Sequence, residues 1–316
     1  ILSHCQGYTY ASLAWIALCE KKPVYVLYGD YGTQRFFHLS EKKDIFAYPS
    51  RPSLNEVAQI SVRTKNKLIK CGEQIIEDRF KGLANDVGSQ YAYCKNSEQI
   101  NNKLIKNYFK WESDKKIIAV YCSNWFDFPH ACGLKDYTDF KDWLEVTLYA
   151  ASKNTEVNWL FKSHPCDDHY PTLRGETMRD LILKYDLNHL QASPTEWNSS
   201  QLMQSLDGIV TCHGTIGIEA SFLGIPVLVP YKGWYGHFDF VRTSSSKIEY
   251  IALLNSNWFE EPLNHKKIIN TSLFAGFYFA KPKWQKYSYQ DDSKQDHIYK
   301  SLKKDSKLYC FVDCTS

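Results

Sequence analysis

The sequence lacks the features that mark membrane-spanning, disulfide-linked and zinc-binding proteins. No apolar run reaches the ~18 residues that a transmembrane helix needs. The 10 cysteines are scattered along the chain, and none forms a C-x-x-C pair, so neither a disulfide framework nor a zinc site is expected. We therefore expect a cytoplasmic protein with reduced thiols, no metal ion and no cofactor.

An excess of charge is also missing. The net charge is +3, only seven of the 38 basic residues are arginine, and no long basic run occurs. This argues against a nucleic-acid-binding protein but is compatible with an anionic small ligand. The Lys-, Asp-, Ser- and Gln-rich stretch 281–307 is predicted to be a solvated end of the fold. A peripheral contact with an anionic membrane surface is the alternative for this stretch.

Short apolar runs alternate with longer amphipathic stretches, which is the pattern of βαβ units around a parallel sheet. The length of 316 residues suggests two domains, and the polar stretch 112–116 is the expected border. We predict an N-terminal Rossmann-like domain at 1–112 and a C-terminal one at 113–316 that ends in helices. Because the chain begins at Ile1, inside an expected strand, we expect the first domain to be incomplete.

Periodicity and turn residues predict the individual elements. The expected strands are 1–4, 23–28, 117–122, 157–162, 190–192, 208–211 and 227–229. The expected helices are 8–20, 53–81, 96–110, 137–152, 174–185, 198–206 and 215–223.

The most informative stretch is Gly208–Pro230, where a strand, a small-residue turn, a helix and a second strand follow one another. Gly214 allows a ligand to approach the backbone closely. Thr215 stands at the expected helix start, where free N–H groups and the helix dipole attract phosphate. Glu219 lies one turn further on the same face and would accept hydrogen bonds from ribose hydroxyls. The alternative is an ordinary strand–helix unit that binds nothing.

The run His213-Gly214-Thr215, followed by Glu219-Ala220 and by Leu223-Gly224-Ile225-Pro226-Val227, resembles the donor-binding unit of GT-B glycosyltransferases and related sugar epimerases. The resemblance implies that the turn at His213, Gly214 and Thr215 takes the phosphate and that Glu219 takes the ribose. It also implies an α/β fold of the GT-B kind, with two Rossmann-type domains facing a cleft.

A second motif, Lys162-Ser163-His164-Pro165, ends the strand expected at 157–162. Open α/β sheets bind ligands at such strand ends, so His164 could donate to a phosphate oxygen while Lys162 adds charge. The alternative is a histidine that is satisfied at a strand-to-loop corner. The motif resembles the His-Pro motif of transferases that use CMP-activated acidic sugars, in which the His contacts the CMP phosphate. A similar Lys-x-His-Pro sequence occurs in glycerophosphate polymerases that use CDP-glycerol, so the donor stays open.

A third motif, Ser123-Asn124-Trp125-Phe126-Asp127-Phe128-Pro129-His130, follows the strand expected at 117–122. Asp127 is the predicted catalytic carboxylate, acting as nucleophile in a retaining reaction or as base in an inverting one. The alternative is a turn residue before Phe128-Pro129. His130 would bind the sugar carboxylate or close the turn.

Residues 117–230 as a whole resemble bacterial capsule and surface-polysaccharide proteins, including β-Kdo transferases, and the likeness extends loosely over residues 1–40. This resemblance implies the nucleophile role for Asp127. In the first domain, His4, Gln6 and Tyr8 lie at an expected strand end, and Arg35 follows a glycine-rich break. These four are predicted to contact the acceptor. Helix capping is the alternative for the first three, and a solvated surface position is the alternative for Arg35.

The sequence thus predicts a glycosyltransferase that moves a sugar, with Kdo from CMP-Kdo as the leading choice, onto a surface-polysaccharide or glycolipid acceptor. No metal ion, cofactor or nucleic acid is expected to take part. The reaction is expected in the cytoplasm, at or near the inner face of the membrane. Two alternatives stay open: an enzyme that transfers a polyol phosphate from a CDP-alditol, and a non-catalytic glycan- or nucleotide-binding subunit of a polysaccharide assembly complex.

Overall fold

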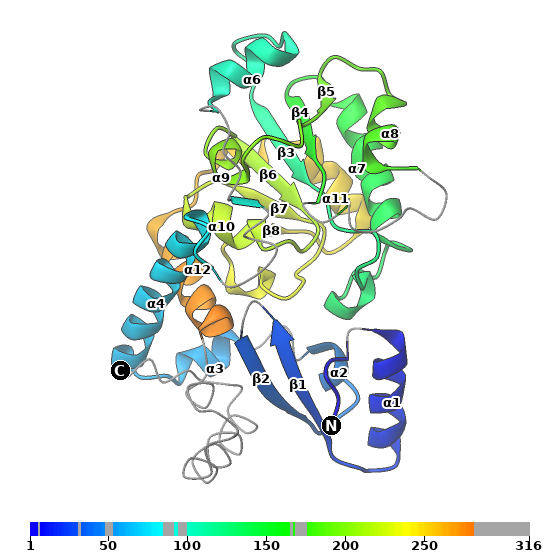
Figure 1. Ribbon diagram of the computed structural model, residues 1–316, viewed down its shortest axis with the longest axis vertical. Coiled ribbons are helices and arrows are strands. Elements are labelled where there is room, and N and C mark those ends of the chain that lie inside the picture. The colour runs from blue at the N-terminus through cyan, green and yellow to red at the C-terminus, as the bar shows by residue number, and fades with distance from the viewer. Residues whose placement is uncertain are drawn as a thin grey trace. The chain divides into compact units, whose positions relative to one another are not determined.

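The computed structural model of the chain describes residues 1–5, 7–30, 33–47, 53–84, 92–93, 100–164, 167 and 176–280 (Figure 1). The stretch 281–307 lies outside these residues. The chain divides into two compact units, and their segments are interleaved along the sequence. Unit 1 comprises Ile1–Glu77, His130–Gly133 and Ser272–Ser316, whereas unit 2 comprises Asp78–Pro129 and Leu134–Thr271.

The domain border expected near residue 112 falls inside unit 2. Residues 100–109 are tied to the later part of this unit by hydrogen bonds. The Ile100 N–H donates to Gln201 Oε1 at 3.0 Å, and the Asn102 side chain donates to the Ser205 carbonyl at 3.0 Å. Because these partners are about a hundred positions away in the sequence, local composition gives no sign of the grouping.

Unit 2 is built on a six-stranded parallel sheet (Figure 1). Its strands are β3 (Ile117–Tyr121), β4 (Asn158–Lys162), β5 (Leu190–Ala192), β6 (Gly208–Thr211), β7 (Val227–Val229) and β8 (Arg242–Thr243). The spatial order β5-β4-β3-β6-β7-β8 is the 3-2-1-4-5-6 order of the Rossmann fold. All residues of β3 and β4 are buried, as expected for parallel strands that are covered on both faces.

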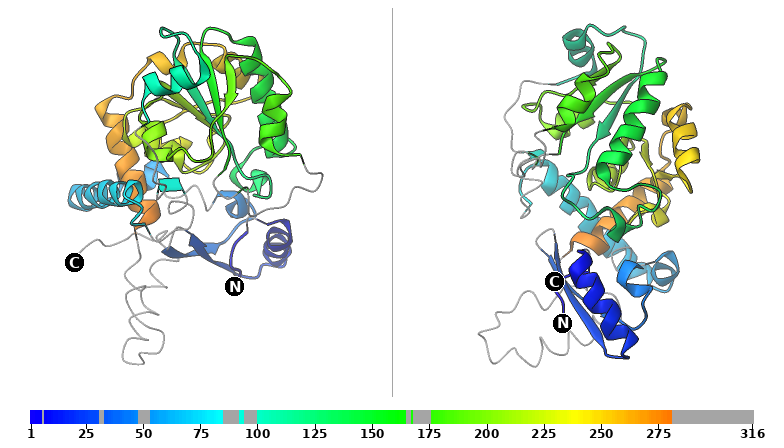
Figure 2. Two further views of the ribbon diagram at one scale, coloured as in Figure 1. Left: turned by 45° about the horizontal axis from the view of Figure 1, so that its top comes forward. Right: turned by 90° about the vertical axis from the view of Figure 1, so that its right-hand side faces the viewer.

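Helices cover both faces of this sheet (Figure 2). They are α6 (Asn102–Phe109), α7 (Phe140–Lys153), α8 (Met178–Leu183), α9 (Ser199–Met203), α10 (Ile216–Phe222) and α11 (Lys247–Leu254), with the 3-10 turns η4 (Gly236–Phe238) and η5 (Trp258–Glu260). The core between α7 and α11 contains a buried polar contact, in which Trp143 Nε1 donates to the Tyr250 hydroxyl at 3.0 Å. Asp139 caps α7 by accepting from the Asp142 N–H at 2.8 Å, which fixes where this helix begins.

Unit 1 contains an antiparallel pair of strands, β1 (Val24–Asp30) and β2 (Thr33–Leu39), with Val24 opposite Leu39. Leu2 adds a single parallel bridge to Val26 on β1, where the sequence predicted a strand end. The helices of this part of the chain are α1 (Tyr8–Cys19), α2 (Asp44–Ala47), α3 (Leu54–Ala58), α4 (Val62–Phe80) and α12 (His265–Phe279), with the 3-10 turn η2 (Pro129–Cys132). The expected helix 53–81 is interrupted because the Ser61 hydroxyl accepts from the Thr64 N–H and starts a new helix.

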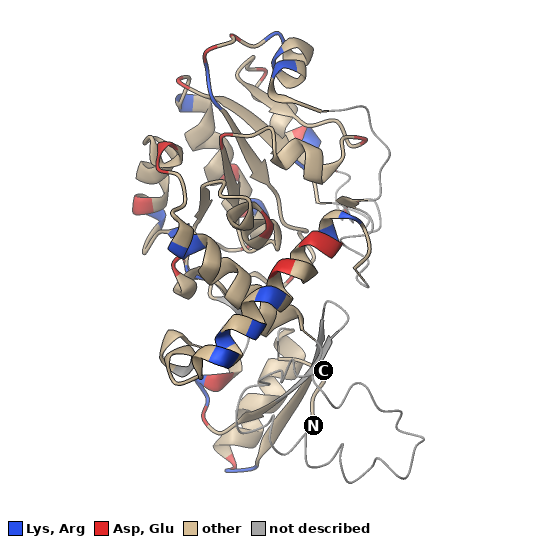
Figure 3. Ribbon diagram, turned by 90° about the vertical axis from the view of Figure 1, so that its left-hand side faces the viewer, with Lys and Arg blue, Asp and Glu red and all other residues tan. Residues whose placement is uncertain are grey.

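Most charged side chains along α4 are grouped by sign (Figure 3). The first half carries Arg63, Lys65, Lys67 and Lys70, and the second half carries Glu73, Glu77 and Asp78, followed by Arg79 in the last turn. A helix dipole favours the opposite order, so packing must stabilise this helix. It crosses α12 at two glycines: a Cβ on Gly72 would lie 1.9 Å from the Ser272 carbonyl oxygen, and one on Gly276 would lie 2.0 Å from that of Leu68.

Within the described part of the chain, no helix is both long enough and apolar enough to span a membrane.

Candidate functional site

The carboxyl ends of β3, β4 and β6 lie next to one another at the middle of the sheet in unit 2. Tyr121 at the end of β3 is paired with Lys162 on one side and with Thr211 on the other. The strand order reverses between β3 and β6, and open α/β sheets bind ligands in the crevice at such a point. The fold therefore brings the three motifs singled out in the sequence, which begin at Ser123, Lys162 and His213, to one edge of one sheet.

The turn between β6 and α10 is held from beneath by two aromatic side chains. Trp234 Nε1 donates to the His213 carbonyl at 2.8 Å, and the Tyr235 hydroxyl donates to the Gly214 carbonyl at 3.0 Å. Both aromatic residues are buried. A Cβ on Gly217 would lie 2.4 Å from the Tyr235 hydroxyl, so glycine is needed here for close packing. The turn is thus fixed in shape before any ligand binds.

Two histidines stand at the rim of this turn. The backbone N–H of His164 donates to the Asp167 carboxylate at 3.0 Å. Burial lowers the pKa of His164 to about 4. Burial, together with the neighbouring His164, lowers the pKa of His213 to about 4. Both imidazoles are therefore neutral at pH 7.

The Nδ1 atom of His213 is buried and has no hydrogen-bond partner among the residues that the structure describes. A buried polar atom without a partner is costly, and native proteins rarely keep one unless a ligand or water uses it. In the described residues no group of three or more His, Cys, Asp or Glu side chains is placed to hold a metal ion. A ligand or an ordered water would complete the hydrogen bonding of this nitrogen.

The lowered histidine pKa values predict how stability depends on pH. In the unfolded chain a histidine has a pKa of 6.5, whereas in the folded chain the pKa of His164 and of His213 is about 4. Because the unfolded state holds more protons between these values, the free energy of unfolding falls as the pH is lowered through this window. Urea denaturation should show a shallower decline for His164→Gln than for the parent chain. The exposed control His265→Gln should follow the parent, and equal slopes for all three would contradict the assignment.

The loop after β3 is a turn built by Asn124 and not by Asp127. The Asn124 side-chain oxygen accepts from the Phe126 N–H at 2.8 Å, and its carbonyl accepts from the Asp127 N–H at 3.2 Å. Among the described residues, none forms a hydrogen bond or ion pair with the Asp127 carboxylate. This side chain is more than a third exposed, yet neighbouring atoms desolvate it enough to raise its pKa. Turn chemistry accounts for Asn124 and leaves the Asp127 carboxylate available for reaction.

Lys162 is buried at the end of β4, with 7% of its surface exposed. Its ammonium group donates to the Trp197 carbonyl at 3.1 Å. The charge is therefore held beneath the strand ends and does not extend into solvent. From this position it contributes a positive potential to the site.

Glu219, the predicted ribose ligand, lies in a buried network on the first turn of α10 and is 1% exposed. Arg79 Nε donates to one carboxylate oxygen at 2.6 Å, and the Tyr93 hydroxyl donates to the other. A second guanidinium nitrogen of Arg79 lies 3.4 Å from the Thr215 hydroxyl. A carboxylate can accept about four hydrogen bonds, so a ribose contact would be an additional one. The first role of the network is to fix the start of α10.

Sequence reasoning missed Arg79 and Tyr93. Each lies more than a hundred positions from Glu219, and a single Arg near the end of a long helix forms no recognisable motif. The burial of Glu219 was the only available signal, since a buried carboxylate needs a partner.

The predicted acceptor residues that the structure describes belong to unit 1. The His4 ring packs against Tyr10, with ring centroids 4.7 Å apart. The Tyr8 hydroxyl hydrogen-bonds with Nδ1 of His130, which also belongs to unit 1. Arg35 lies on β2 opposite Tyr28. Two further predicted site residues, Gln6 and Pro165, lie outside the described residues.

No protein-family model matches the sequence, and no curated protein sequence matches it either. Among solved structures, the chain is similar to the β-Kdo 2,4 transferase of KpsC from Thermosulfurimonas dismutans. The TM-score is 0.50 and the identity 14%, over 84% of this chain and 85% of that one. The β-Kdo 2,7 transferase of the same organism's KpsC gives a TM-score of 0.39 at 18% identity, over 73% and 60% of the two chains. The wall teichoic acid polymerase TagF gives a TM-score of 0.31 at 15% identity, over 64% of this chain and 45% of that one.

The first of these likenesses spans most of both chains and shows a common fold. The chain therefore has the α/β fold of the GT-B kind that its sequence predicted. At 14% identity this similarity is evidence for the fold alone. We draw no conclusion from the two structures with lower TM-scores.

Proposed function

We propose that the chain is a glycosyltransferase that binds a CMP-activated acidic sugar at the carboxyl ends of β3, β4 and β6 and transfers the sugar to a glycan or glycolipid. One observation carries the proposal: the neutral rings of His164 and His213 lie near enough to influence each other at the reversal point of a Rossmann-type sheet, and Nδ1 of His213 has no partner among the described residues. The choice of Kdo as the sugar rests on the resemblance of residues 117–230 to β-Kdo transferases and on the fold shared with one of them.

The phosphate of the donor would be bound by uncharged and fixed groups. A neutral imidazole donates through one nitrogen and accepts through the other, so His164 and His213 can each donate one hydrogen bond to a phosphate oxygen. The Thr215 N–H lies beside them, next to the Gly214 N–H that donates to the Thr211 hydroxyl at 3.4 Å, and Lys162 supplies positive potential from beneath. Such preorganised donors stabilise the charge that develops on a leaving phosphate.

Asp127 would carry the chemistry in either of two ways. As a nucleophile, its carboxylate forms a bond to the anomeric carbon while the bond from that carbon to the phosphate oxygen breaks, and CMP leaves with the electron pair. The acceptor hydroxyl then displaces the carboxylate, which leaves with its electron pair, and the hydroxyl proton passes to solvent. As a base, Asp127 takes the proton of the acceptor hydroxyl, whose oxygen attacks the anomeric carbon while the bond from that carbon to the phosphate oxygen breaks and CMP leaves with the electron pair. The desolvation that raises the pKa of Asp127 suits both roles.

The acceptor contacts predicted in unit 1 remain part of the proposal. Tyr8 is 61% exposed and hydrogen-bonds with His130, so this pair offers a polar surface to a glycan hydroxyl. We place the reaction in the cytoplasm, at the inner face of the membrane where a lipid-linked acceptor would be reached.

A nucleotide panel in a thermal-shift assay tests this function. A ligand present at about 100 times its dissociation constant adds ~2.7 kcal/mol to the free energy of unfolding. CMP and CMP-Kdo should raise the melting temperature of the parent chain and of His265→Ala, an exposed control, but should hardly affect His164→Ala. Stronger stabilisation by CDP-glycerol than by CMP would favour the polyol-phosphate transferase. Without any shift from cytidine nucleotides, the donor assignment fails.

A further inference from the structure

A cavity of about 430 Å³ lies at the carboxyl ends of β4 and β5 in unit 2. This volume falls within the ~300–1,000 Å³ typical of small-molecule sites. It is lined by the Asn124 turn, by residues that follow the two strands and by α8. The turn at His213–Thr215, to which we assign the donor phosphate, contributes no lining residue. The cavity is therefore free to hold a different part of a ligand.

The walls of the cavity combine flat apolar surfaces with small polar groups. Trp125 and Phe126 stand on the side of the Asn124 turn, and Phe126 is 43% exposed. Ser163 and Thr195 add hydroxyl groups after β4 and β5. A sugar ring has an apolar C–H face that packs on an aromatic ring and hydroxyls at its edge that need hydrogen-bond partners. The lining has the mixture of groups that a pyranose requires.

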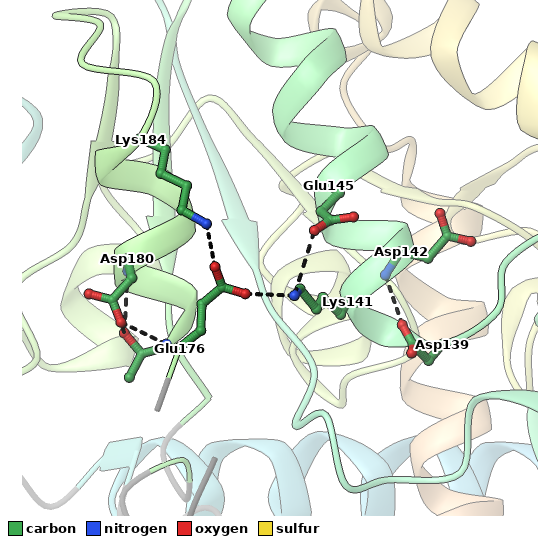
Figure 4. A network of polar contacts seen from close by, with 8 residues as sticks. Asp139, Lys141, Asp142, Glu145, Glu176, Asp180 and Lys184 are labelled. Carbon is green, nitrogen blue, oxygen red and sulfur yellow. Dashed lines mark hydrogen bonds and ion pairs between the residues drawn. The ribbon is translucent and has the colours of Figure 1, made fainter. Parts of the chain in front are cut away.

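A network of charged side chains holds the rim in place (Figure 4). Lys141 on α7 reaches Glu176, just before α8, at 2.6 Å, and Glu176 also pairs with Lys184 on α8. The Lys141 ammonium lies 5.8 Å from the centre of the Trp125 ring. The Thr177 hydroxyl is engaged with Asp180 at the start of α8. Lys141 is thus paired with Glu176 and, at 3.8 Å, with Glu145, and Lys184 shares Glu176 with it, so both rim lysines already have carboxylate partners.

Arg179 differs from these lysines. Of the described residues that line the cavity, it is the one with a positive charge. No hydrogen bond or ion pair of the described residues involves its guanidinium group. An Arg side chain stays protonated and presents two parallel N–H donors that fit a carboxylate. Asp167 also lines the cavity, and its carboxylate accepts from the backbone N–H of His164. Arg179 therefore offers a carboxylate-binding group beside a surface suited to a sugar.

We propose that this cavity binds the ring of an acidic sugar, with its carboxylate on Arg179 and its apolar face on Trp125 and Phe126. The proposal rests on the proposed function and deepens it, because it names a subsite for the sugar itself. The sugar is either the one that the nucleotide carries or the terminal acidic sugar of the acceptor. Asp127 directly follows Phe126 in the chain, so a sugar in this cavity is adjacent to the proposed catalytic loop.

Isothermal titration of the full chain tests the subsite. The probes are CMP-Kdo, CMP, the methyl glycoside of Kdo and, as a neutral sugar, methyl glucoside. Arg179→Gln should weaken the binding of an acidic-sugar probe by roughly ten- to a hundred-fold and leave CMP unchanged, because it removes a charge-assisted pair. Arg179→Lys should retain part of the affinity. Arg63→Gln makes the same substitution at an exposed arginine on α4 and should change nothing.

The two acidic probes separate the possible sources of the sugar. A loss confined to CMP-Kdo assigns the cavity to the donor sugar, and a loss confined to the methyl glycoside assigns it to the acceptor. The proposal is overturned if Arg179→Gln binds both acidic probes as the parent does, if methyl glucoside binds as well as the Kdo glycoside, or if neither acidic probe binds the parent. If the methyl glycoside binds in a way that depends on Arg179 but CMP does not bind, the cavity is an acidic-sugar site and the proposed use of a CMP-activated donor is wrong.

Discussion

Asp127→Asn is expected to slow sugar transfer by roughly 10²- to 10⁴-fold or more, because an amide can act neither as a nucleophile nor as a general base. The affinity for CMP should stay unchanged, since the phosphate is assigned to His164 and His213 on other loops. The fold should also be unaffected, because the turn around Asp127 is built by Asn124. The measurement is the rate of CMP release from CMP-Kdo in the presence of a Kdo-terminated acceptor, together with a CMP titration.

Asp114→Asn is the matched control, because it makes the same change at an exposed Asp in the loop before β3. It should transfer sugar at the parent rate. If Asp127→Asn also keeps the parent rate, Asp127 is a loop residue and the catalytic group lies elsewhere. If the parent binds CMP-Kdo but never releases CMP from it, the chain is a non-catalytic binding subunit.

Arg79→Met is expected to lower the free energy of unfolding by about 3–5 kcal/mol, because it leaves the buried Glu219 carboxylate without its cation. The Arg79 and Glu219 side chains are 4% and 2% exposed. Breaking a pair at this depth exposes the full desolvation penalty of the remaining charge. Nucleotide affinity should fall as well, because Arg79 also contacts Thr215 at the start of α10. Urea denaturation and a CMP titration provide the two readouts.

Two further variants make this prediction specific. Arg79→Met combined with Glu219→Gln should recover part of the lost stability, because no uncompensated charge remains. Arg242→Met removes one partner of the exposed Arg242–Glu261 pair and should cost less than ~1 kcal/mol. A loss of stability from Arg79→Met no larger than that from Arg242→Met would show that the buried network contributes little.

Much of unit 2 could be predicted from the sequence, because its strands are continuous apolar runs between turn residues. The expected strands at 117–122, 157–162, 190–192, 208–211 and 227–229 agree with β3 to β7 within one residue at either end. The two-residue strand β8 is too short to give a pattern. In unit 1, β2 (Thr33–Leu39) was not predicted, since the sequence T-Q-R-F-F-H-L has no clear alternation of polar and apolar residues.

The meeting of the three motifs was also predictable, because the carboxyl ends of parallel strands share one edge of a sheet. The groups that complete the site were not. Arg79 and Tyr93 approach Glu219 from segments far away in the sequence. Arg179 follows the first residue of α8 and belongs to no motif. The sequence hypothesis assigned the sugar carboxylate to His130, and the structure offers Arg179 beside the cavity as a second candidate. The Arg179 variants decide between them.

Hydrogen–deuterium exchange with and without CMP-Kdo tests the central claim most directly, because it reports both whether a cytidine donor binds and where. The account predicts slower exchange in the loop after β3, around Asn124–Asp127, at His164 after β4, and in the turn His213–Thr215, with CMP alone protecting the last two. Unchanged exchange at all three strand ends, or protection confined to other parts of the chain, would contradict it.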